Sequence, residues 1–153
     1  MTPIQSYMAG DHRRCDDLFA IAEQAVAEQT WDRARVAFSG FQRAMAQHFT
    51  AEESLLFPAF ESKSGMSMGP TEVMRVEHAQ MMELMTATDQ ALVAQDADDY
   101  SGNAETLLIM MQQHNMKEEN VLYPMCDDHL ANQVDALLLD LERQLKQTSG
   151  LAV

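Results

Sequence analysis

The chain has 153 residues, 46% of them hydrophobic, which is enough for one domain with a core that folds without disulfide bonds. Its 10 lysines and arginines against 24 aspartates and glutamates give a formal net charge of −14, which would repel nucleic acid and anionic membrane surfaces. No apolar run approaches the roughly 20 residues of a membrane helix, and Cys15 and Cys126 are too few for a disulfide framework, so we expect a cytoplasmic protein that binds neither nucleic acid nor membrane.

Helix-forming residues dominate the chain, and a few turn signals divide it into long segments without strand patterns. Thr2 and Pro3 are typical of a helix start. Four long helices are expected, over about residues 3–28, 30–61, 70–95 and 102–127, with a polar turn over 96–101 and a final amphipathic helix over about 131–146. The predicted fold is all-α, an up-down-up-down four-helix bundle with an additional short C-terminal helix, forming one domain over residues 1–148 with a flexible tail over 149–153.

An internal repeat with an offset of 66 residues runs through the bundle. Residues 48–58 read HFTAEESLLFP and residues 114–124 read HNMKEENVLYP. The same offset maps His12 onto His78. The chain therefore consists of two copies of a helical hairpin, each with one histidine in its first helix and a His-x-x-x-Glu pair in its second.

The repeated histidines and glutamates are expected to meet at one level. A His-x-x-x-Glu pair places both side chains on one helix face, a single turn apart. The two histidines of each hairpin are each 18 residues from the predicted turn between their helices, so they should lie side by side, about 27 Å from that turn. Six candidate metal ligands result: His12, His48, Glu52, His78, His114 and Glu118.

These six groups predict a metal centre, because buried imidazoles and carboxylates are costly unless they are paired or bound to metal. The ligand types suit iron, manganese or zinc, and six are too many for one tetrahedral zinc. If the two glutamates bridge two metals, each metal also takes the two histidines of one hairpin. The remaining positions would hold a water-derived oxo or hydroxo bridge and a small ligand such as dioxygen, nitric oxide or peroxide.

Several neighbours of these ligands are candidates for supporting roles. Four acidic residues adjoin a ligand in sequence and are expected to accept hydrogen bonds from the imidazoles, to edge a channel, or to lie in solvent: Asp11, Glu53, Glu77 and Glu119. Met8 and Met74 lie one turn before a candidate histidine and should pack over the site, mainly as core.

The remaining reactive side chains have simpler readings. Cys15 is expected to be a buried inert thiol, and no role is assigned to Cys126. His129 has no counterpart in the repeat and is not expected to be a ligand. Phe57 and Tyr123 correspond in the repeat and are expected to be core aromatics.

The two His-x-x-x-Glu motifs followed by Leu-aromatic-Pro, the early single histidine and the stretch MGPTEVMRVEHAQMMEL resemble the hemerythrin HHE cation-binding family over about residues 3–127. The resemblance implies a helical bundle with two iron ions. The ferritin-like alternative uses Glu-x-x-His, and no histidine here has a glutamate three positions before it.

Within that family the ligand pattern departs from the oxygen carriers, which have a further histidine and an aspartate where this chain has Met74 and Glu118. Four histidines with two glutamates are more similar to the di-iron domain of iron-sulfur cluster repair proteins of the RIC type. That resemblance implies that Glu77 lies beside the path of the small molecule.

The expected function is therefore that of a non-haem di-iron protein that binds dioxygen, nitric oxide or peroxide in oxidative or nitrosative stress response or sensing. The alternatives are a di-iron oxidoreductase that reduces peroxide or nitric oxide or donates iron in cluster repair, with a redox partner protein, and a protein of iron storage or sensing.

Overall fold

The computed structural model describes residues 2–151, and from residue 147 onward the backbone alone. Its principal helices are α1 (Pro3–Ala27), α2 (Trp31–Ala51), α3 (Phe57–Ser64), α4 (Pro70–Val93), α5 (Ala97–Lys117), α6 (Tyr123–His129) and α7 (Val134–Leu151). Two π-helical turns, η1 (Glu52–Leu56) and η2 (Glu118–Leu122), and a short 3₁₀ turn, η3 (Ala131–Gln133), lie between them. Residues 2–151 contain no strand, so the predicted all-α class is confirmed.

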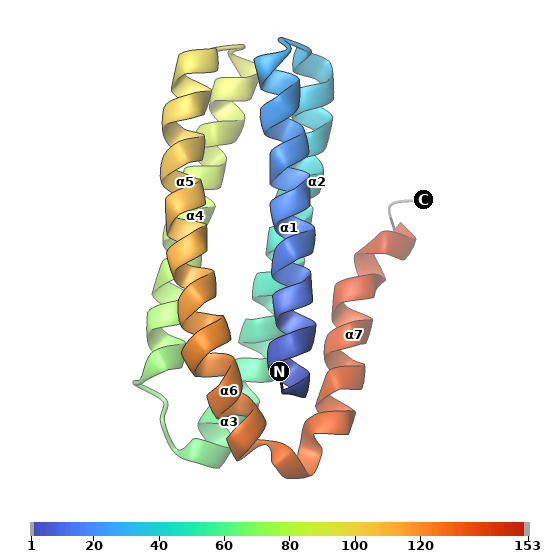
Figure 1. The fold of residues 1–153 in the computed structure, drawn as a ribbon, viewed down its shortest axis with the longest axis vertical. Coiled ribbons are helices and arrows are strands. Elements are labelled where there is room, and N and C mark those ends of the chain that lie inside the picture. Colours follow the sequence, from blue (N-terminus) through green and yellow to red (C-terminus); the bar gives the residue numbers. More distant parts are fainter. Residues whose placement is uncertain (1, 152–153) are drawn as a thin grey trace.

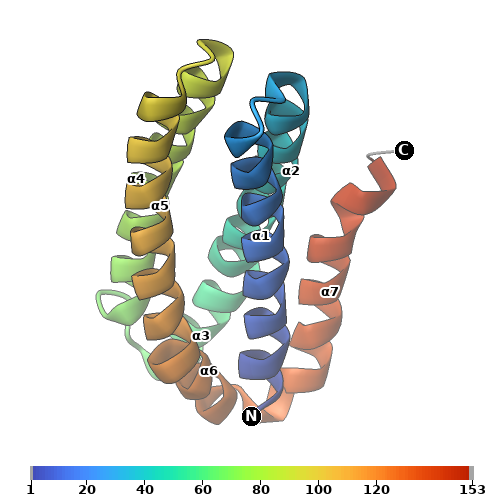
Figure 2. The same cartoon turned by 45° about the horizontal axis from the view of Figure 1, so that its top comes forward.

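The four long helices form an antiparallel bundle (Figure 1). Helices α1 and α2 make one hairpin and α4 and α5 make the other, while α2 packs against α4 and α1 against α5. This closes the ring of an up-down-up-down bundle, as the repeat predicts. Figure 2 shows α7 lying outside this ring, where it packs along α2 and α1.

The repeat extends to the turns at the upper end of the bundle. Gln29 and Gln95, which are 66 residues apart, both have positive φ angles, 57° and 54°. Each ends a helix in the left-handed conformation that commonly terminates helices. The predicted polar turn over 96–101 is wrong, because Asp96 accepts a hydrogen bond from the backbone N–H of Asp99 at 3.0 Å and so caps α5, which begins at Ala97.

The second helix of each hairpin is not continuous, contrary to the prediction. The backbone N–H of Phe57 donates to the carbonyl of Glu52, five residues earlier, and that of Tyr123 donates to the carbonyl of Glu118 in the same way. Pro58 and Pro124 follow directly, and a proline ring would clash with the carbonyl four residues earlier in a regular α-helix. A wider π turn relieves this clash, and α3 and α6 then continue across the lower end of the bundle.

The core is divided into an upper and a lower apolar cluster. The upper one holds Phe19, Phe38 and Phe41 among its buried residues, and the lower one gathers side chains from both ends of the chain, including Ile4 and Tyr123. The candidate ligands lie in neither apolar cluster, although residues of both clusters contact them.

Helix α7 buries Leu137, Leu141 and Leu145 against the lower cluster, and Gln47 donates to the carbonyl of Leu145 at 3.0 Å. The helix runs to Leu151, beyond its expected end near residue 146. Residues 152 and 153 of the expected tail lie outside the described residues. None of the described helices combines the length and apolar character that crossing a bilayer requires.

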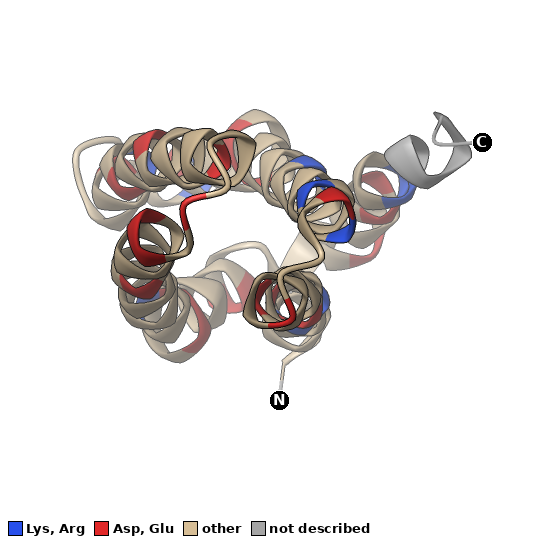
Figure 3. Cartoon of the chain, turned by 90° about the horizontal axis from the view of Figure 1, so that it is seen from above, with Lys and Arg blue, Asp and Glu red and all other residues tan. Residues whose placement is uncertain are grey.

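Viewed from above, the bundle carries many more acidic than basic positions, which matches the net charge of −14 (Figure 3).

Candidate metal centre

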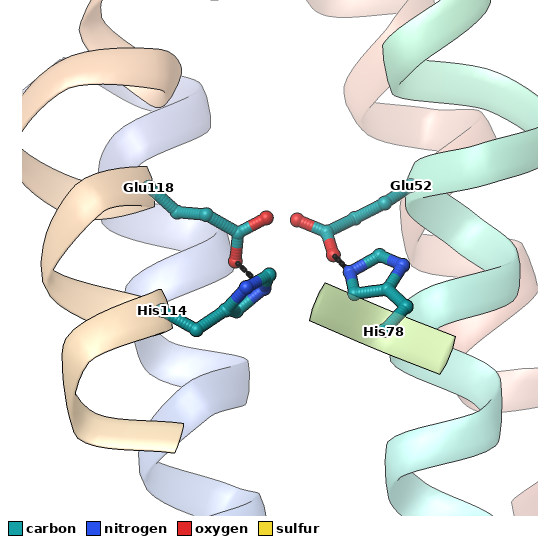
Figure 4. Close-up of side chains that lie close together, drawn as sticks. All are labelled: Glu52, His78, His114 and Glu118. Atoms are coloured by element: carbon teal, nitrogen blue, oxygen red, sulfur yellow. Dashed lines mark ion pairs between the residues drawn. The ribbon is translucent and has the colours of Figure 1, made fainter. Parts of the chain in front are cut away.

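All six candidate ligands come together in one buried layer of the bundle. Their exposed fractions are at most 4%. One residue comes from each long helix, and each glutamate is the first residue of a π turn: His12 (α1), His48 (α2), Glu52 (η1), His78 (α4), His114 (α5) and Glu118 (η2). Figure 4 shows Glu52 and Glu118 facing each other with His78 and His114 beneath them. The four histidines thus lie at one level, as their equal distances from the turns predicted, and each His-x-x-x-Glu pair brings its glutamate to the same layer.

The histidines pair by hairpin, and each glutamate contacts both pairs. The ring centroids of His12 and His48 are 4.6 Å apart, and those of His78 and His114 are 5.0 Å apart. Oε1 of Glu118 lies 3.0 Å from Nε2 of His12 and 3.2 Å from Nε2 of His114.

The second glutamate repeats this arrangement. Oε1 of Glu52 lies 3.0 Å from Nε2 of His78 and 3.5 Å from Nε2 of His48. Each carboxylate thus lies between the two histidine pairs, which is the placement that a bridging ligand needs.

Each histidine directs its other ring nitrogen at a second carboxylate. Within a hairpin, Nδ1 of His48 lies 2.8 Å from Oδ2 of Asp11, and Nδ1 of His114 lies 2.9 Å from Oε1 of Glu77. An ionised carboxylate only accepts hydrogen bonds, so Nδ1 is the donor. The lone pair of the neutral imidazole is then on Nε2, which points into the cluster.

The other two contacts cross between hairpins. Nδ1 of His12 donates to Oε2 of Glu119 at 2.7 Å, and Nδ1 of His78 donates to Oε2 of Glu53 at 2.6 Å. A shift of 66 residues maps His12 onto His78 and Glu53 onto Glu119, so each of these contacts is the repeat counterpart of the other and the site has approximate twofold symmetry. All four flanking acids thus contact an imidazole, and this was the first of the three roles considered for them.

Neighbouring opposite charges shift the pKa values of His48, His114 and Glu52. Burial opposes the charge on His48 and His114, yet nearby carboxylates raise the pKa of His48 well above its usual value and that of His114 to about 9. Burial also opposes the charge on Glu52, but His48 holds the pKa of that carboxyl well below its usual range. The raised pKa values of His48 and His114 favour protons on these two imidazoles beside the carboxylates, and a bound cation would take the place of such protons.

Hydrogen bonding leaves part of this cluster unsatisfied. Nε2 of His78 and Nε2 of His114 lie 3.0 and 3.2 Å from a glutamate oxygen, but not in the geometry of a hydrogen bond. By that criterion four buried atoms have no hydrogen-bond partner among the described residues: Oε1 of Glu52, Oε2 of Glu118, Nε2 of His78 and Nε2 of His114. Buried polar atoms without partners are rare in folded proteins. Four such atoms, all pointing into one layer, fit the donor set of metal ions better than they fit packing. Two groups of ligand atoms close enough to share an ion occur here, His12 with His48 and Glu118, and Glu52 with His78, His114 and Glu118.

A tyrosine hydroxyl also lies inside the cluster, which the sequence analysis missed. The ring of Tyr123 is fully buried, and its hydroxyl oxygen lies 2.7 Å from Oε2 of Glu52 and 2.9 Å from Oε1 of Glu118. Burial, together with these carboxylates, raises the pKa of Tyr123 well above its usual value. Its repeat counterpart, Phe57, is a core aromatic as expected. The one sequence signal that Tyr123 also contacts the glutamates was that the repeat has tyrosine at one position and phenylalanine at the other.

The other singled-out side chains lie outside the ligand layer. Met8 and Met74 are buried in the lower apolar cluster. Cys15 and Cys126 are buried free thiols, and burial raises the pKa of both, that of Cys15 to about 11, which makes them poor nucleophiles. His129 is exposed and packs its edge on Phe60.

A cavity of about 380 Å³ reaches the ligand layer between α2 and α4. His78, Glu53 and Phe49 line it on the side of the centre, and Arg75 and Met82 contribute to its wall. Glu77, which was expected beside such a path, does not line this cavity; it binds Lys117 and His114.

Comparison with known families gives one result that agrees with this geometry. The model of the hemerythrin HHE cation binding domain matches residues 4–126. Neither the curated proteins nor the solved structures contain a match to the chain. The matched segment covers all six inward-facing candidate ligands and the four carboxylates behind them. The chain therefore belongs to the hemerythrin HHE cation-binding domain family.

Proposed function

We propose that this protein is a non-haem di-iron protein that binds a small ligand, dioxygen, nitric oxide or peroxide, at a centre of four histidines and two glutamates. The observation that carries the proposal is the placement of both buried carboxylates between two histidine pairs. In that position Glu52 and Glu118 can each bridge two ions. Imidazole and carboxylate ligands suit iron, and manganese or zinc would accept the same set.

The charge of the site supports two cations. Six carboxylates contact the four imidazoles, and two of them also contact a basic side chain: Asp11 binds Arg14, and Glu77 binds Lys117. Six negative charges and two positive ones leave four negative charges, which two divalent ions would balance. The same negative charge raises the pKa of His48 and His114, so it favours a positive charge at this layer.

The two halves of the site differ in what surrounds the histidines, and this supports a binding position on one side. Tyr123 places a hydroxyl beside His12, whereas the corresponding ring beside His78 is Phe57, which has none. Phe49 also stacks on His78, with ring centroids 3.9 Å apart. A small ligand entering through the cavity that His78 lines would therefore pass the ring of Phe49 and reach the half of the centre that lacks the tyrosine hydroxyl.

The same chemistry admits other uses of the centre. In one, the protein is an oxidoreductase that reduces peroxide or nitric oxide, or donates iron in cluster repair as RIC-type proteins do, and it needs a redox partner. In another, iron occupancy stabilises the bundle for iron storage or sensing. Stress response or sensing in the cytoplasm is our first choice, because the cavity that His78 lines gives a small ligand access to a buried centre.

The test is anaerobic loading with Fe(II), followed by metal analysis and absorption spectroscopy before and after addition of dioxygen, nitric oxide or peroxide. Two irons per chain and a stable spectral change on addition of one ligand support the proposal. Sustained turnover by the reduced protein supports the oxidoreductase. A large gain in protease resistance on loading, without spectral response to any ligand, supports iron storage or sensing. Failure to bind iron overturns all three.

A further inference from the structure

We propose that Tyr123 is a seventh protein ligand, which binds through its phenolate oxygen the iron held by His12 and His48. The inference rests on the proposed two-iron centre and adds to it a residue from α6, beyond the six histidine and glutamate ligands. It also distinguishes the two irons from each other, because the repeat has phenylalanine at the corresponding position.

The position of the hydroxyl oxygen carries the inference. It lies 2.7 Å from Oε2 of Glu52, 2.9 Å from Oε1 of Glu118, 3.2 Å from Nε2 of His12 and 3.3 Å from Nε2 of His48. In a six-coordinate site with bonds of about 2.1 Å, neighbouring ligand atoms are about 3.0 Å apart and opposite ones about 4.2 Å apart. The tyrosine oxygen thus has four neighbours at the spacing of adjacent ligands around one ion.

The spacing among these neighbours agrees with the same geometry. Nε2 of His12 and Oε1 of Glu118 are 3.0 Å apart, as adjacent ligands would be. Nε2 of His48 and the same oxygen of Glu118 are 4.0 Å apart, close to the spacing of opposite ligands. An ordinary hydrogen-bonded tyrosine does not require this arrangement.

If Tyr123 only formed hydrogen bonds, its hydroxyl could not satisfy all of its neighbours once metal is bound. A phenol has one proton and serves one of the two carboxylates at a time. When Nε2 of His12 and Nε2 of His48 bind metal they carry no proton, so neither can donate to the phenol oxygen. On coordination the O–H bond breaks, an iron–oxygen bond forms, and the proton leaves to solvent, as occurs for other metal ligands that must be deprotonated.

The repeat supplies an internal comparison. The ring of Tyr123 stacks on His12 with centroids 5.6 Å apart and planes at 27°, and the ring of Phe57 stacks on His78 at 5.8 Å and 18°. The two rings are packed alike, and the hydroxyl is the difference between them. Tyrosine would therefore fill a position on one iron that stays open on the other.

Spectroscopy of the iron-loaded, oxidised protein tests the inference. An iron(III)–phenolate bond gives a visible charge-transfer band, and excitation in that band enhances tyrosine ring vibrations in the Raman spectrum. We expect both features in the wild type, and we expect the vibrations to shift when the protein is made with ring-deuterated tyrosine. Tyr123→Phe should lose the band. Tyr100→Phe is the matched control, because Tyr100 is also buried and its hydroxyl has no hydrogen-bond partner among the described residues.

The outcomes separate this inference from the proposed function. Two irons per chain without a phenolate band, or a band that persists in Tyr123→Phe, overturns the tyrosine ligand and leaves the di-iron centre standing. A wild type that binds no iron overturns the di-iron proposal itself. If Tyr123→Phe does not fold, the shift in the labelled wild type and the unchanged spectra of Tyr100→Phe and Tyr7→Phe still decide the assignment, since these are the three tyrosines of the chain.

Discussion

Replacing Glu118 by glutamine removes a buried negative charge that contacts histidines of both hairpins. Its Oε1 lies 3.0 Å from Nε2 of His12 and 3.2 Å from Nε2 of His114, so the substitution weakens the ligand set of both ions. An ion at a free concentration of 100 times its dissociation constant stabilises the fold by about 2.7 kcal/mol per site. Two ions would add about 5.4 kcal/mol, and a variant that holds at most one would gain about 2.7 kcal/mol or less.

The assay is urea unfolding of Glu118→Gln and wild type, each with and without Fe(II) under anaerobic conditions, together with iron analysis. The difference between loaded and metal-free protein is compared within each variant, so the direct effect of the substitution on the metal-free fold cancels. We expect iron content to fall from two per chain to one or none.

Glu119→Gln is the matched control, because Glu119 adjoins Glu118 but contacts Nδ1 of His12 from behind. Loss of such a supporting carboxylate costs about 10–100-fold in metal affinity, so this variant should still take up two irons at saturation. If Glu118→Gln binds two irons and gains as much stability from them as the wild type, Glu118 is not a bridging ligand and the reasoning fails.

Three further predictions concern the scaffold. Asp127 accepts hydrogen bonds from two backbone N–H groups in the first turn of α1, at 2.8 and 3.0 Å. Asp127→Ala should lower the free energy of unfolding, measured by urea denaturation, by about 1.5–3 kcal/mol. The same change at the exposed Asp128 should have little effect. Phe41→Ala empties a fully buried site in the upper apolar cluster and should cost about 3–5 kcal/mol while leaving the iron content of the folded protein unchanged. The guanidinium of Arg75 lowers the pKa of Glu61, so Glu61→Gln should be less stable than wild type at neutral pH. This difference in the free energy of unfolding should shrink as the pH falls below about 4.5, because the unfolded carboxyl then takes up its proton. A constant difference across that range would contradict the ion-pair explanation.

The layer of candidate ligands was predictable because it follows from counting along the chain. The 66-residue offset is visible in the sequence, and equal distances of paired histidines from their turns place them at one level by helical rise and antiparallel packing alone. The short polar turn before α5 was misjudged because Asp96 can either extend a loop or cap a helix, and only the hydrogen bond to Asp99 decides between them.

The contacts that organise the site depend on features that counting does not capture. The π turns arise where a proline would clash with the carbonyl four residues earlier, and each adds one residue to the turn that begins at Glu52 or Glu118. The wider turn changes which side chains after it face inward. The sequence therefore predicted that Tyr123 belongs to the apolar core, but not that its hydroxyl contacts Glu52 and Glu118. The crossed contacts of Glu119 with His12 and Glu53 with His78 depend on how the two hairpins face each other, which sequence spacing within one hairpin leaves open.

The central claim is that two ions share the buried glutamates, and a Mössbauer measurement on protein loaded with isotopically enriched iron tests it most directly. The account predicts two irons per chain, and in the oxidised protein a spin-coupled pair, because bridging ligands couple the two ions magnetically. One iron per chain, or two irons that behave as isolated ions, would contradict it.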